Sequence, residues 1–353
     1  MTMYVPLVGQ FDNLGDIFLR RRLAAWIPGD MQVLVGSAPA DFVAALALPP
    51  STTVHRSFGR WAAAMAVDRS GAGYVYKPGE IQMSAPGMKE HVGLLPLIAR
   101  LRASGGSVAR VGVGTRSVAQ PYVALCRPSV ALCTITLWRD EATRNAFGRG
   151  RVAPDLAFGE GSDVADWEHH ERSVVAISLR GDKPLPSDAW FESITAFAAR
   201  RGLEPVAVSQ VRRDDARTRE CARRIGGRAL AMDGSSFSAV EDAVRLLYRQ
   251  SALVVSDRLH VLVGAATEGA PVSALLDGGS IKIRRHFDVL GLGRIEGDTE
   301  RHDRTRRLEG LENAADSVAD VRLGVQQARR DLANAQRDFH AAMSFDAAEL
   351  PGR

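Results

Sequence analysis

Lysine is scarce in this chain of 353 residues: four of its 45 basic residues are lysines, and the others are arginines. The 41 acidic residues nearly balance them, so the formal net charge is only +4. Nucleic-acid-binding proteins concentrate a much stronger positive charge on one face. The composition therefore argues against a nucleic-acid partner and indicates arginines that lie mostly among acids on solvated surfaces.

Cysteine and long hydrophobic runs are scarce as well. The three cysteines form no Cys-x-x-Cys pair and no even disulfide framework, which is typical of a reducing compartment. No run approaches the roughly 20 apolar residues that span a bilayer, and the N-terminal apolar stretch is too short for a signal peptide. The pair His169-His170 has no ligand spacing nearby, so it predicts a solvated linker rather than a metal site. We expect a cytoplasmic protein without a bound metal.

Short runs rich in Val and Ile alternate with longer helical patterns in both halves of the chain. The predicted strands are Tyr4–Val8, Gln32–Val35, Gly73–Tyr76, Val108–Val113, Val130–Leu137, Ser173–Leu179, Glu204–Val208, Ala252–Ser256 and Pro271–Leu275. The main predicted helices are Asp16–Trp26, Met88–Ala103, Ala189–Arg201 and Ala239–Gln250. Several strands are apolar on both faces, as in buried parallel sheets. The pattern predicts an α/β protein with two Rossmann-like parallel-sheet domains.

The polar segment Gly159–Arg172 is the best domain boundary. It predicts an N-terminal domain over residues 1–160 and a C-terminal domain over residues 161–315. The strongly charged segment Glu296–Asn313 predicts a surface connection into a terminal helix over residues 316–345. Apolar residues recur every three or four positions in Val318–Met343, so this helix either packs across the domains or forms a coiled-coil contact in a homodimer.

Cationic side chains gather where the predicted strands of the second half end. Arg258 and His260 fall in the first turn of the helix that follows the strand Ala252–Ser256. A helix N-terminus at the carboxyl end of a parallel strand is where α/β proteins bind anions. Lys282 follows the next strand, and Arg180 ends the first strand of this half. Together they predict a site for a phosphate or a carboxylate.

The first half carries weaker signals. The turn Asn13-Leu14-Gly15-Asp16 follows the first strand, and Gly15 there permits a close backbone approach. The stretch Gly112–Ser117 contains Gly-x-Gly but lacks the third glycine and the acidic residue of a dinucleotide fingerprint, so it predicts a turn.

A further strand end in the first half carries Arg139 and Asp140. Arg139 is suited to clamp a carboxylate or phosphate, while Asp140 suits both a helix cap and a catalytic role.

In order along the chain, these pieces resemble the polysaccharide pyruvyl transferase family. The resemblance is carried by Asn13–Asp16, Trp138–Asp140, Pro154–Phe158, Ile177–Arg180, Ser256–His260, Gly269–Pro271, Lys282 and Leu290–Leu292. It implies two GT-B-like domains facing a cleft, with the acceptor on the N-terminal side and the donor on the C-terminal side. It also implies transfer of a pyruvyl group from phosphoenolpyruvate to two hydroxyls of a sugar in a cell-surface polysaccharide or its precursor. The product is a pyruvate ketal, and phosphate is released.

Carried over residue by residue, the resemblance implies Arg139, His260 and Lys282 as the catalytic residues. We expect substrate contacts from Arg258, Arg180, Asn13, Gly15, Asp16 and Asp140. The chemistry agrees, because phosphoenolpyruvate carries a phosphate and a carboxylate that call for several fixed cations. Protonated His260 would deliver the proton to the C3 methylene, and Asp16 or Asp140 would accept the sugar proton. The scheme requires no cofactor.

Two other functions fit the same features: a GT-B glycosyltransferase that uses a nucleotide sugar, and a non-catalytic protein that binds glycans or other polyanions. For the transferase, the expected partners are phosphoenolpyruvate and a sugar acceptor. A lipid-linked oligosaccharide acceptor would place the enzyme at the inner face of the cytoplasmic membrane as a peripheral protein.

Overall fold

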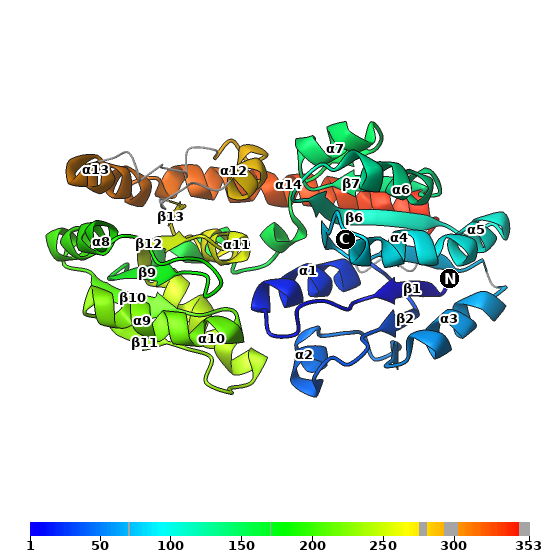
Figure 1. Cartoon of the computed structure of the whole chain (residues 1–353), viewed down its shortest axis with the longest axis horizontal. Coiled ribbons are helices and arrows are strands. Elements are labelled where there is room, and N and C mark those ends of the chain that lie inside the picture. The colour runs from blue at the N-terminus through cyan, green and yellow to red at the C-terminus, as the bar shows by residue number, and fades with distance from the viewer. Residues whose placement is uncertain (70, 170, 275–280, 293–302, 346–353) are drawn as a thin grey trace. The chain divides into compact units, whose positions relative to one another are not determined.

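The computed structural model of the chain describes residues 1–69, 71–169, 171–274, 281–292 and 303–345. Its strands and helices divide into two units (Figure 1). Unit 1 comprises Met1–Phe11, Asp16–Leu156 and the chain from Asp331, and unit 2 comprises Asp12–Gly15 and Ala157–Arg330. The short turn Asp12–Gly15 thus belongs to unit 2 although its neighbours in sequence belong to unit 1.

Unit 1 is built on a parallel sheet in which the strand order is β3-β2-β1-β4-β6-β7-β8, with β5 paired to β6. The strands are β1 (Met3–Pro6), β2 (Met31–Leu34), β3 (Thr53–His55), β4 (Gly73–Tyr76), β5 (Gly79–Ile81), β6 (Val108–Thr115), β7 (Ile135–Trp138) and β8 (Arg151–Val152). The helices are α1 (Leu14–Ala25), α2 (Ala40–Ala45), α3 (Phe58–Val67), α4 (Lys89–Gly93), α5 (Leu95–Ala103), α6 (Gln120–Ala131) and α7 (Glu141–Phe147).

Unit 2 is built on a second parallel sheet with the strand order β11-β10-β9-β12-β13. Its strands are β9 (Val174–Ser178), β10 (Glu204–Val208), β11 (Arg228–Leu230), β12 (Ser251–Ser256) and β13 (Val272–Ser273). Its helices are α8 (Asp188–Arg201), α9 (Asp215–Ile225), α10 (Phe237–Arg249), α11 (Leu259–Thr267), α12 (Ile281–Asp288) and α13 (Arg304–Ala315). Helix α14 (Val318–Met343) begins in unit 2 and ends in unit 1.

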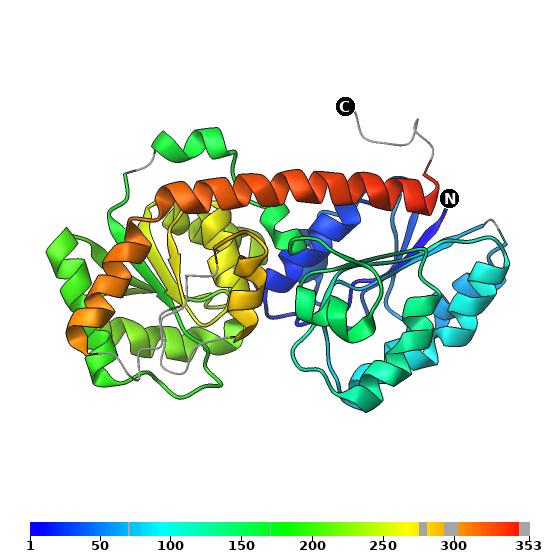
Figure 2. The ribbon, with the colours of Figure 1, turned by 90° about the horizontal axis from the view of Figure 1, so that it is seen from above.

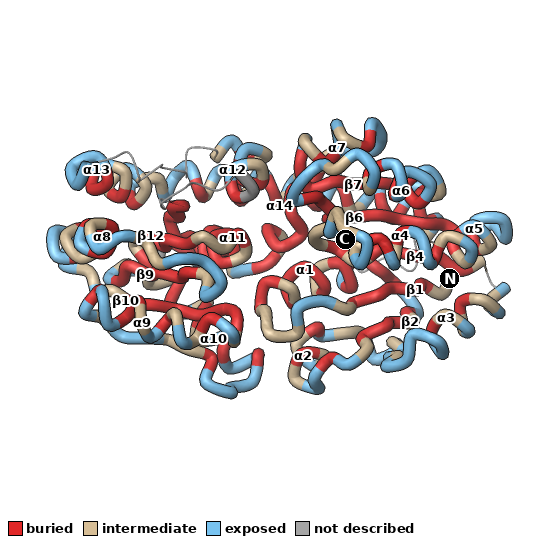
Figure 3. The backbone as a smooth tube through the Cα atoms, in the orientation of Figure 1, coloured by how far each residue is buried: buried red, intermediate tan, exposed pale blue. Residues whose placement is uncertain are grey.

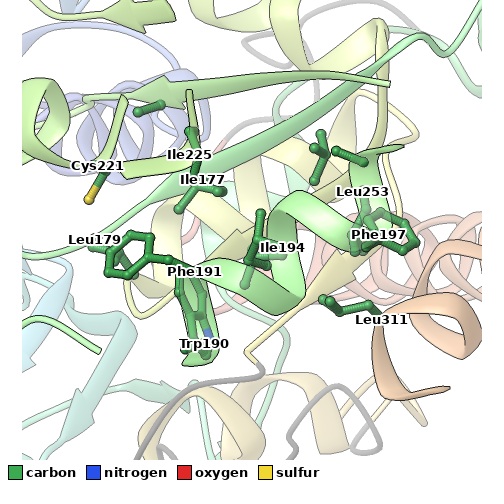
Figure 4. Close-up of a cluster of buried hydrophobic side chains, with 14 of the residues drawn as sticks. Ile177, Leu179, Trp190, Phe191, Ile194, Phe197, Cys221, Ile225, Leu253 and Leu311 are labelled. Atoms are coloured by element: carbon green, nitrogen blue, oxygen red, sulfur yellow. The ribbon is translucent and has the colours of Figure 1, made fainter. Parts of the chain in front are cut away.

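Apolar strands and the inner faces of helices form the cores. The central strands of both sheets are buried along their length, whereas the helices alternate buried and exposed stretches (Figure 3). In unit 2, Trp190, Phe191, Ile194 and Phe197 of α8 pack over strand residues such as Ile177 (Figure 4). Burial of each large apolar side chain contributes roughly 1.5–3 kcal/mol, so this packing stabilises α8 on the sheet of unit 2.

Helix α14 is one continuous helix, coloured orange to red in Figure 2. Its boundaries are those that the spacing of apolar residues predicts. Within unit 1, Phe339 lies against Trp26 with ring centroids 6.0 Å apart, and the His340 ring nitrogen Nε2 lies 2.6 Å from the Trp26 carbonyl oxygen. In unit 2, Arg329 donates a hydrogen bond to the carbonyl oxygen of Glu160 at 2.7 Å. The helix is therefore packed within this chain.

Three local expectations are wrong. Residues 130–131 end α6 rather than begin a strand, because Val130 belongs to the buried face of that helix. The segment Gly112–Thr115 is the last part of β6 and not a turn, since a register shift between Val111 and Val113 lets the strand continue.

The third concerns the segment Glu296–Asn313. Its described part forms most of α13, capped by Asp303, because Leu308 and Leu311 pack into the core of unit 2.

The expected architecture of two Rossmann-like parallel sheets with a long C-terminal helix is confirmed. Across the residues that the structure describes, no helix is both long enough and apolar enough to cross a membrane.

Candidate functional site

Three neighbouring strands of unit 2 place the predicted anion-binding residues at one edge. β10, β9 and β12 are adjacent and parallel, so the loops that follow them meet at their carboxyl ends. The Ser256 hydroxyl donates a hydrogen bond to the Ser178 carbonyl oxygen at 2.7 Å and joins the last residues of β12 and β9. The same hydroxyl accepts the backbone N–H of Arg258 at 3.0 Å. The start of α11 is thereby tied to the end of β9.

Six charged residues form what we call the charged cluster of unit 2. They are Arg180, Asp182 and Lys183 after β9, Asp214 after β10, and Asp257 and Arg258 after β12. Arg180 donates two hydrogen bonds to Asp182, from Nε at 2.8 Å and from Nη2 at 2.6 Å. Arg258 forms an ion pair with Asp214, and the Lys183 Nζ lies 3.6 Å from an oxygen of Asp257.

Two carboxylates of the cluster also hold the loop after β9. Asp257 accepts the backbone N–H of Arg180 at 2.9 Å, and Asp214 accepts the backbone N–H of Gly181 at 2.8 Å. Consecutive backbone N–H groups of this kind often bind external anions. Here internal carboxylates occupy them, so an external anion must be bound by side chains.

The cluster has a buried part and an exposed part. The Asp214 and Arg258 side chains are 3% and 12% exposed, whereas those of Asp182 and Lys183 are 57% and 47% exposed. Burial raises the pKa of Asp257, opposed by Lys183, and it lowers the pKa of Arg258, opposed by Asp214. The hydrogen bond from Arg180 lowers the pKa of Asp182 well below its usual range. Partly exposed ion pairs such as Arg180–Asp182, whose side chains are 26% and 57% exposed, contribute only about 0–1 kcal/mol.

The turn Asp12–Gly15 lies beside this edge within unit 2. The Leu14 N–H donates a hydrogen bond to the Gln210 carbonyl at 2.9 Å, and Asn13 forms a backbone bridge with Val211. The Asn13 side chain accepts the N–H of Gly15 at 2.9 Å. A Cβ atom on Gly15 would lie 2.4 Å from the Cβ of His260, so only glycine permits this approach.

Two predicted residues of unit 1 are enclosed by their own neighbours. Arg139 is 2% exposed and donates a hydrogen bond to Asp155 at 3.2 Å. Asp140 caps α7 by accepting the Thr143 N–H at 2.8 Å and the Thr143 hydroxyl at 2.7 Å. A Cβ on Gly114 would come within 3 Å of both Arg139 and Asp140. Gly114 therefore makes room for the side chains of Arg139 and Asp140.

The two remaining predicted residues do not take part in these contacts. Asp16 belongs to unit 1, accepts the Gln10 N–H at 2.6 Å and pairs with Arg20 at 3.3 Å. Lys282 lies in the first turn of α12, and its side chain lies outside the described residues.

The structure adds residues that sequence reasoning missed. Asp182, Lys183, Asp214 and Asp257 complete the cluster. The first three lie in charged loops that resemble an ordinary solvated surface in the sequence. The only sequence signal for them is their position just after a predicted parallel strand. Among the described residues, no group of three or more His, Cys, Asp or Glu side chains is arranged to hold a metal ion.

Comparison with known proteins identifies the fold. No family model matches the sequence, and no curated protein matches it. Solved structures do match along nearly the whole chain. The UDP-GlcNAc 2-epimerase of Neisseria meningitidis, bound to UDP-GlcNAc, gives a TM-score of 0.60 at 9% identity and covers 98% of this chain and 100% of its own.

Two more solved structures are similar to this chain along nearly its whole length. Anabaena HepE in complex with UDP and glucose gives a TM-score of 0.57 at 11% identity, covering 97% of this chain and 99% of its own. The glycotransferase of kitacinnamycin gives a TM-score of 0.53 at 13% identity, covering 97% of this chain and 98% of its own. This chain has a GT-B-like fold. At these identities the similarity concerns the fold alone.

Proposed function

We propose that this chain is a sugar-processing transferase that binds the phosphate of an activated donor at the charged cluster of unit 2. The observation that carries the proposal is the position of Arg180, Arg258 and His260 at the carboxyl ends of the adjacent strands β9 and β12. The N-terminus of α11 adds a partial positive charge at the same place. A small phosphate-bearing molecule is the ligand that this arrangement fits.

The donor phosphate binds by exchange of partners. Arg180 releases the exposed carboxylate of Asp182 and donates the same two hydrogen bonds to phosphate oxygens. Arg258 keeps Asp214 as its buried partner, which fixes the position of its guanidinium. Lys183 lies half-exposed on the same loop and adds a positive charge.

A nucleotide sugar is the donor that the comparisons favour. Two of the similar solved structures are described as bound to UDP-GlcNAc or to UDP and glucose. A diphosphate suits the cationic strand ends of unit 2. In this case the chain transfers or modifies a sugar of the nucleotide sugar, and the fold similarity supports it better than the pyruvyl transferase function.

Phosphoenolpyruvate is the second candidate donor, and a specific observation favours it. Three separate segments that resemble the pyruvyl transferases lie together in unit 2: Asn13–Gly15, Ile177–Arg180 and Ser256–His260. In that reaction His260 protonates C3, a sugar hydroxyl attacks C2, and phosphate leaves before the second hydroxyl closes the ketal. Lys282 keeps the role that the resemblance implies, whereas Arg139 is enclosed within unit 1, where it donates a hydrogen bond to Asp155.

The two donors are distinguished by what the purified chain binds and releases. Thermal unfolding is followed with UDP-glucose, UDP-GlcNAc, phosphoenolpyruvate or inorganic phosphate. A ligand present at 100 times its Kd stabilises the folded state by about 2.7 kcal/mol. A nucleotide-sugar enzyme then releases UDP, whereas a pyruvyl transferase releases inorganic phosphate in the presence of a sugar acceptor. A chain that none of these four molecules stabilises contradicts the proposal.

His260 is tested in the phosphate-releasing reaction. Loss of a positioned general acid typically costs about 10²–10⁴-fold, so His260→Asn is expected to lose turnover to that extent while still binding phosphoenolpyruvate. His55→Asn is the matched control, because His55 is half-buried in unit 1 beside Gln32. Equal turnover in both variants removes His260 from the acid role.

A further inference from the structure

Helix α11 carries a second set of charges at its carboxyl end, away from Arg258 and His260. We call this set the ion-pair network, and its members are Glu160, Glu241, Arg245, Arg249 and Glu268. Glu268 follows the last residue of α11 and is 1% exposed. It accepts hydrogen bonds from Arg245 at 2.6 Å and from Arg249 at 3.0 Å. Both arginines belong to α10, so the network joins α11 to α10.

Arg245 lies at the centre of the ion-pair network. Besides Glu268, it donates hydrogen bonds to Glu241 at 2.8 Å and to Glu160 at 2.9 Å. The side chains of Arg245 and Glu160 are only 16% and 9% exposed. Removing such charges from water costs about as much as their attraction returns, so the network adds little net stability. Its directed hydrogen bonds instead fix how α10, α11 and the segment at Glu160 lie relative to one another.

Two segments near the ends of unit 2 meet the same end of α11. Glu160 and Arg329 each lie a few residues from a point where the chain passes between the units. Arg329 donates hydrogen bonds to the carbonyl oxygen of Glu160 at 2.7 Å and to that of Thr267, the last residue of α11, at 3.4 Å. A Cβ atom on Gly161 would clash with the same Thr267 oxygen, so the segment after Glu160 runs directly against the helix end.

The middle of α11 consists of apolar residues. From Val261 to Ala266 every residue is buried, and the last three of them are the small residues Gly264, Ala265 and Ala266. Apolar contacts are non-directional, so the directed hydrogen bonds at the two ends of the helix determine its position along its axis. At the first end these are the bonds of the Ser256 hydroxyl, and at the second end they are the bonds of Glu268.

We propose that the ion-pair network positions the donor-binding end of α11, with Glu268 as the positioning residue. The proposal rests on the proposed function, since Arg258 and His260 stand at the start of the same helix. The nine residues of α11 span about 13 Å. A helix this short moves as one body, so a shift at Glu268 also displaces Arg258 and His260. Glu268 acts on the reaction through the helix and not by contact with substrate.

The test compares Glu268→Ala with the wild type in the full chain. This variant leaves Arg245 with two carboxylate partners, and the side chain of Arg249 is 26% exposed and can be hydrated. The variant is therefore expected to fold. Hydrogen exchange is expected to become faster at residues 258–263, the far end of α11, as well as beside Glu268. Arg249→Met removes one of the two partners of Glu268 and gives the same comparison if Glu268→Ala does not fold.

Donor binding and turnover give the second readout, with UDP-GlcNAc and phosphoenolpyruvate as the probes. The affinity of Glu268→Ala for the donor that the wild type binds is expected to fall at least about tenfold, because Arg258 no longer makes its charged hydrogen bond in the right place. Turnover is expected to fall on the order of 10²-fold. Glu268→Gln keeps an acceptor oxygen for the arginines and is expected to recover most of both losses.

The matched control is Arg307→Met. Arg307 of α13 donates a hydrogen bond to the Ser193 hydroxyl of α8 at 3.2 Å, so the control breaks a buried polar contact between two other helices of unit 2. It is expected to keep the exchange at residues 258–263 and the donor affinity of the wild type, even with a lower urea midpoint. Faster exchange that is confined to the neighbours of Glu268 overturns the proposal, and so does wild-type affinity and turnover in folded Glu268→Ala. A wild-type chain that binds neither donor contradicts the proposed function instead, and the exchange at residues 258–263 then decides the role of the network.

Discussion

Gly15 gives the sharpest test of how the site is built. It is the second residue of α1, and a Cβ added there would lie 2.4 Å from the Cβ of His260 and 2.8 Å from its Cγ and Nδ1. Carbon atoms in contact are normally about 3.5–4.0 Å apart. The Gly15→Ala variant must therefore push His260 or the turn away by about 1 Å.

The size of the effect follows from this overlap. Overpacking of a tight contact costs about 1–3 kcal/mol, while Gly→Ala in a helix gains roughly 0.5–1 kcal/mol. Gly59 is the matched control because it is the second residue of α3, and a Cβ there would meet only the Ser57 Oγ at 3.9 Å. The helix gain is common to both variants, so their difference in unfolding free energy isolates the contact with His260. We expect Gly15→Ala to be less stable than Gly59→Ala by about 1–3 kcal/mol.

The assay is urea unfolding together with turnover of the donor. Displacement of a catalytic group by about 1 Å lowers turnover on the order of 10²-fold, so Gly15→Ala loses activity and Gly59→Ala keeps it. Equal stability and equal turnover in the two variants would refute the contact between the N-terminal turn and His260. Loss of stability with full turnover would place the contact outside the reacting site.

Two further predictions concern charge. Burial, with added repulsion from Arg110 and Lys77, lowers the pKa of His91 from 6.5 to about 2. The unfolded chain therefore binds a proton that the folded chain does not. Between pH 7 and pH 5 this proton uptake lowers the free energy of unfolding by about 2 kcal/mol. In urea unfolding, the His91→Gln variant is expected to lose this part of the decrease in stability with falling pH. A variant whose stability falls with pH as steeply as that of the wild type contradicts the prediction. The Asp182→Asn variant lacks the carboxylate that competes with phosphate for Arg180. Its affinity for phosphate, measured by calorimetry, is expected to rise by about twofold to fivefold. A weaker affinity would show that Asp182 does not compete with the anion.

The fold is predictable from the sequence wherever periodicity is strong. The apolar positions of α14, such as Val325 and Leu332, recur at helical spacing over many turns, and the predicted helix over residues 316–345 extends two residues beyond each end of α14. The short strands β3, β5, β8 and β11 are missed, since two or three residues carry too little pattern, and β13 is found only as part of the predicted strand Pro271–Leu275. Helix α13 is missed because its charged residues hide the spacing of Leu308 and Leu311.

The site is predictable only in part. Arg180, Arg258 and His260 are found because the carboxyl ends of parallel strands share one edge. Asp214 is missed because its neighbours are charged and its burial comes from the folded loop around it. The place of Asn13 and Gly15 beside His260 depends on contacts between segments more than 200 residues apart, which local patterns do not record.

The central claim is that the phosphate of the donor binds at the charged cluster of unit 2. Its most direct test is a crystal structure of the chain soaked with UDP-GlcNAc or with phosphoenolpyruvate. We predict phosphate oxygens within hydrogen-bond distance of Arg180 and Arg258, with Asp182 turned away from Arg180. A phosphate bound elsewhere, while the Arg180–Asp182 pair stays intact, would contradict the proposed function.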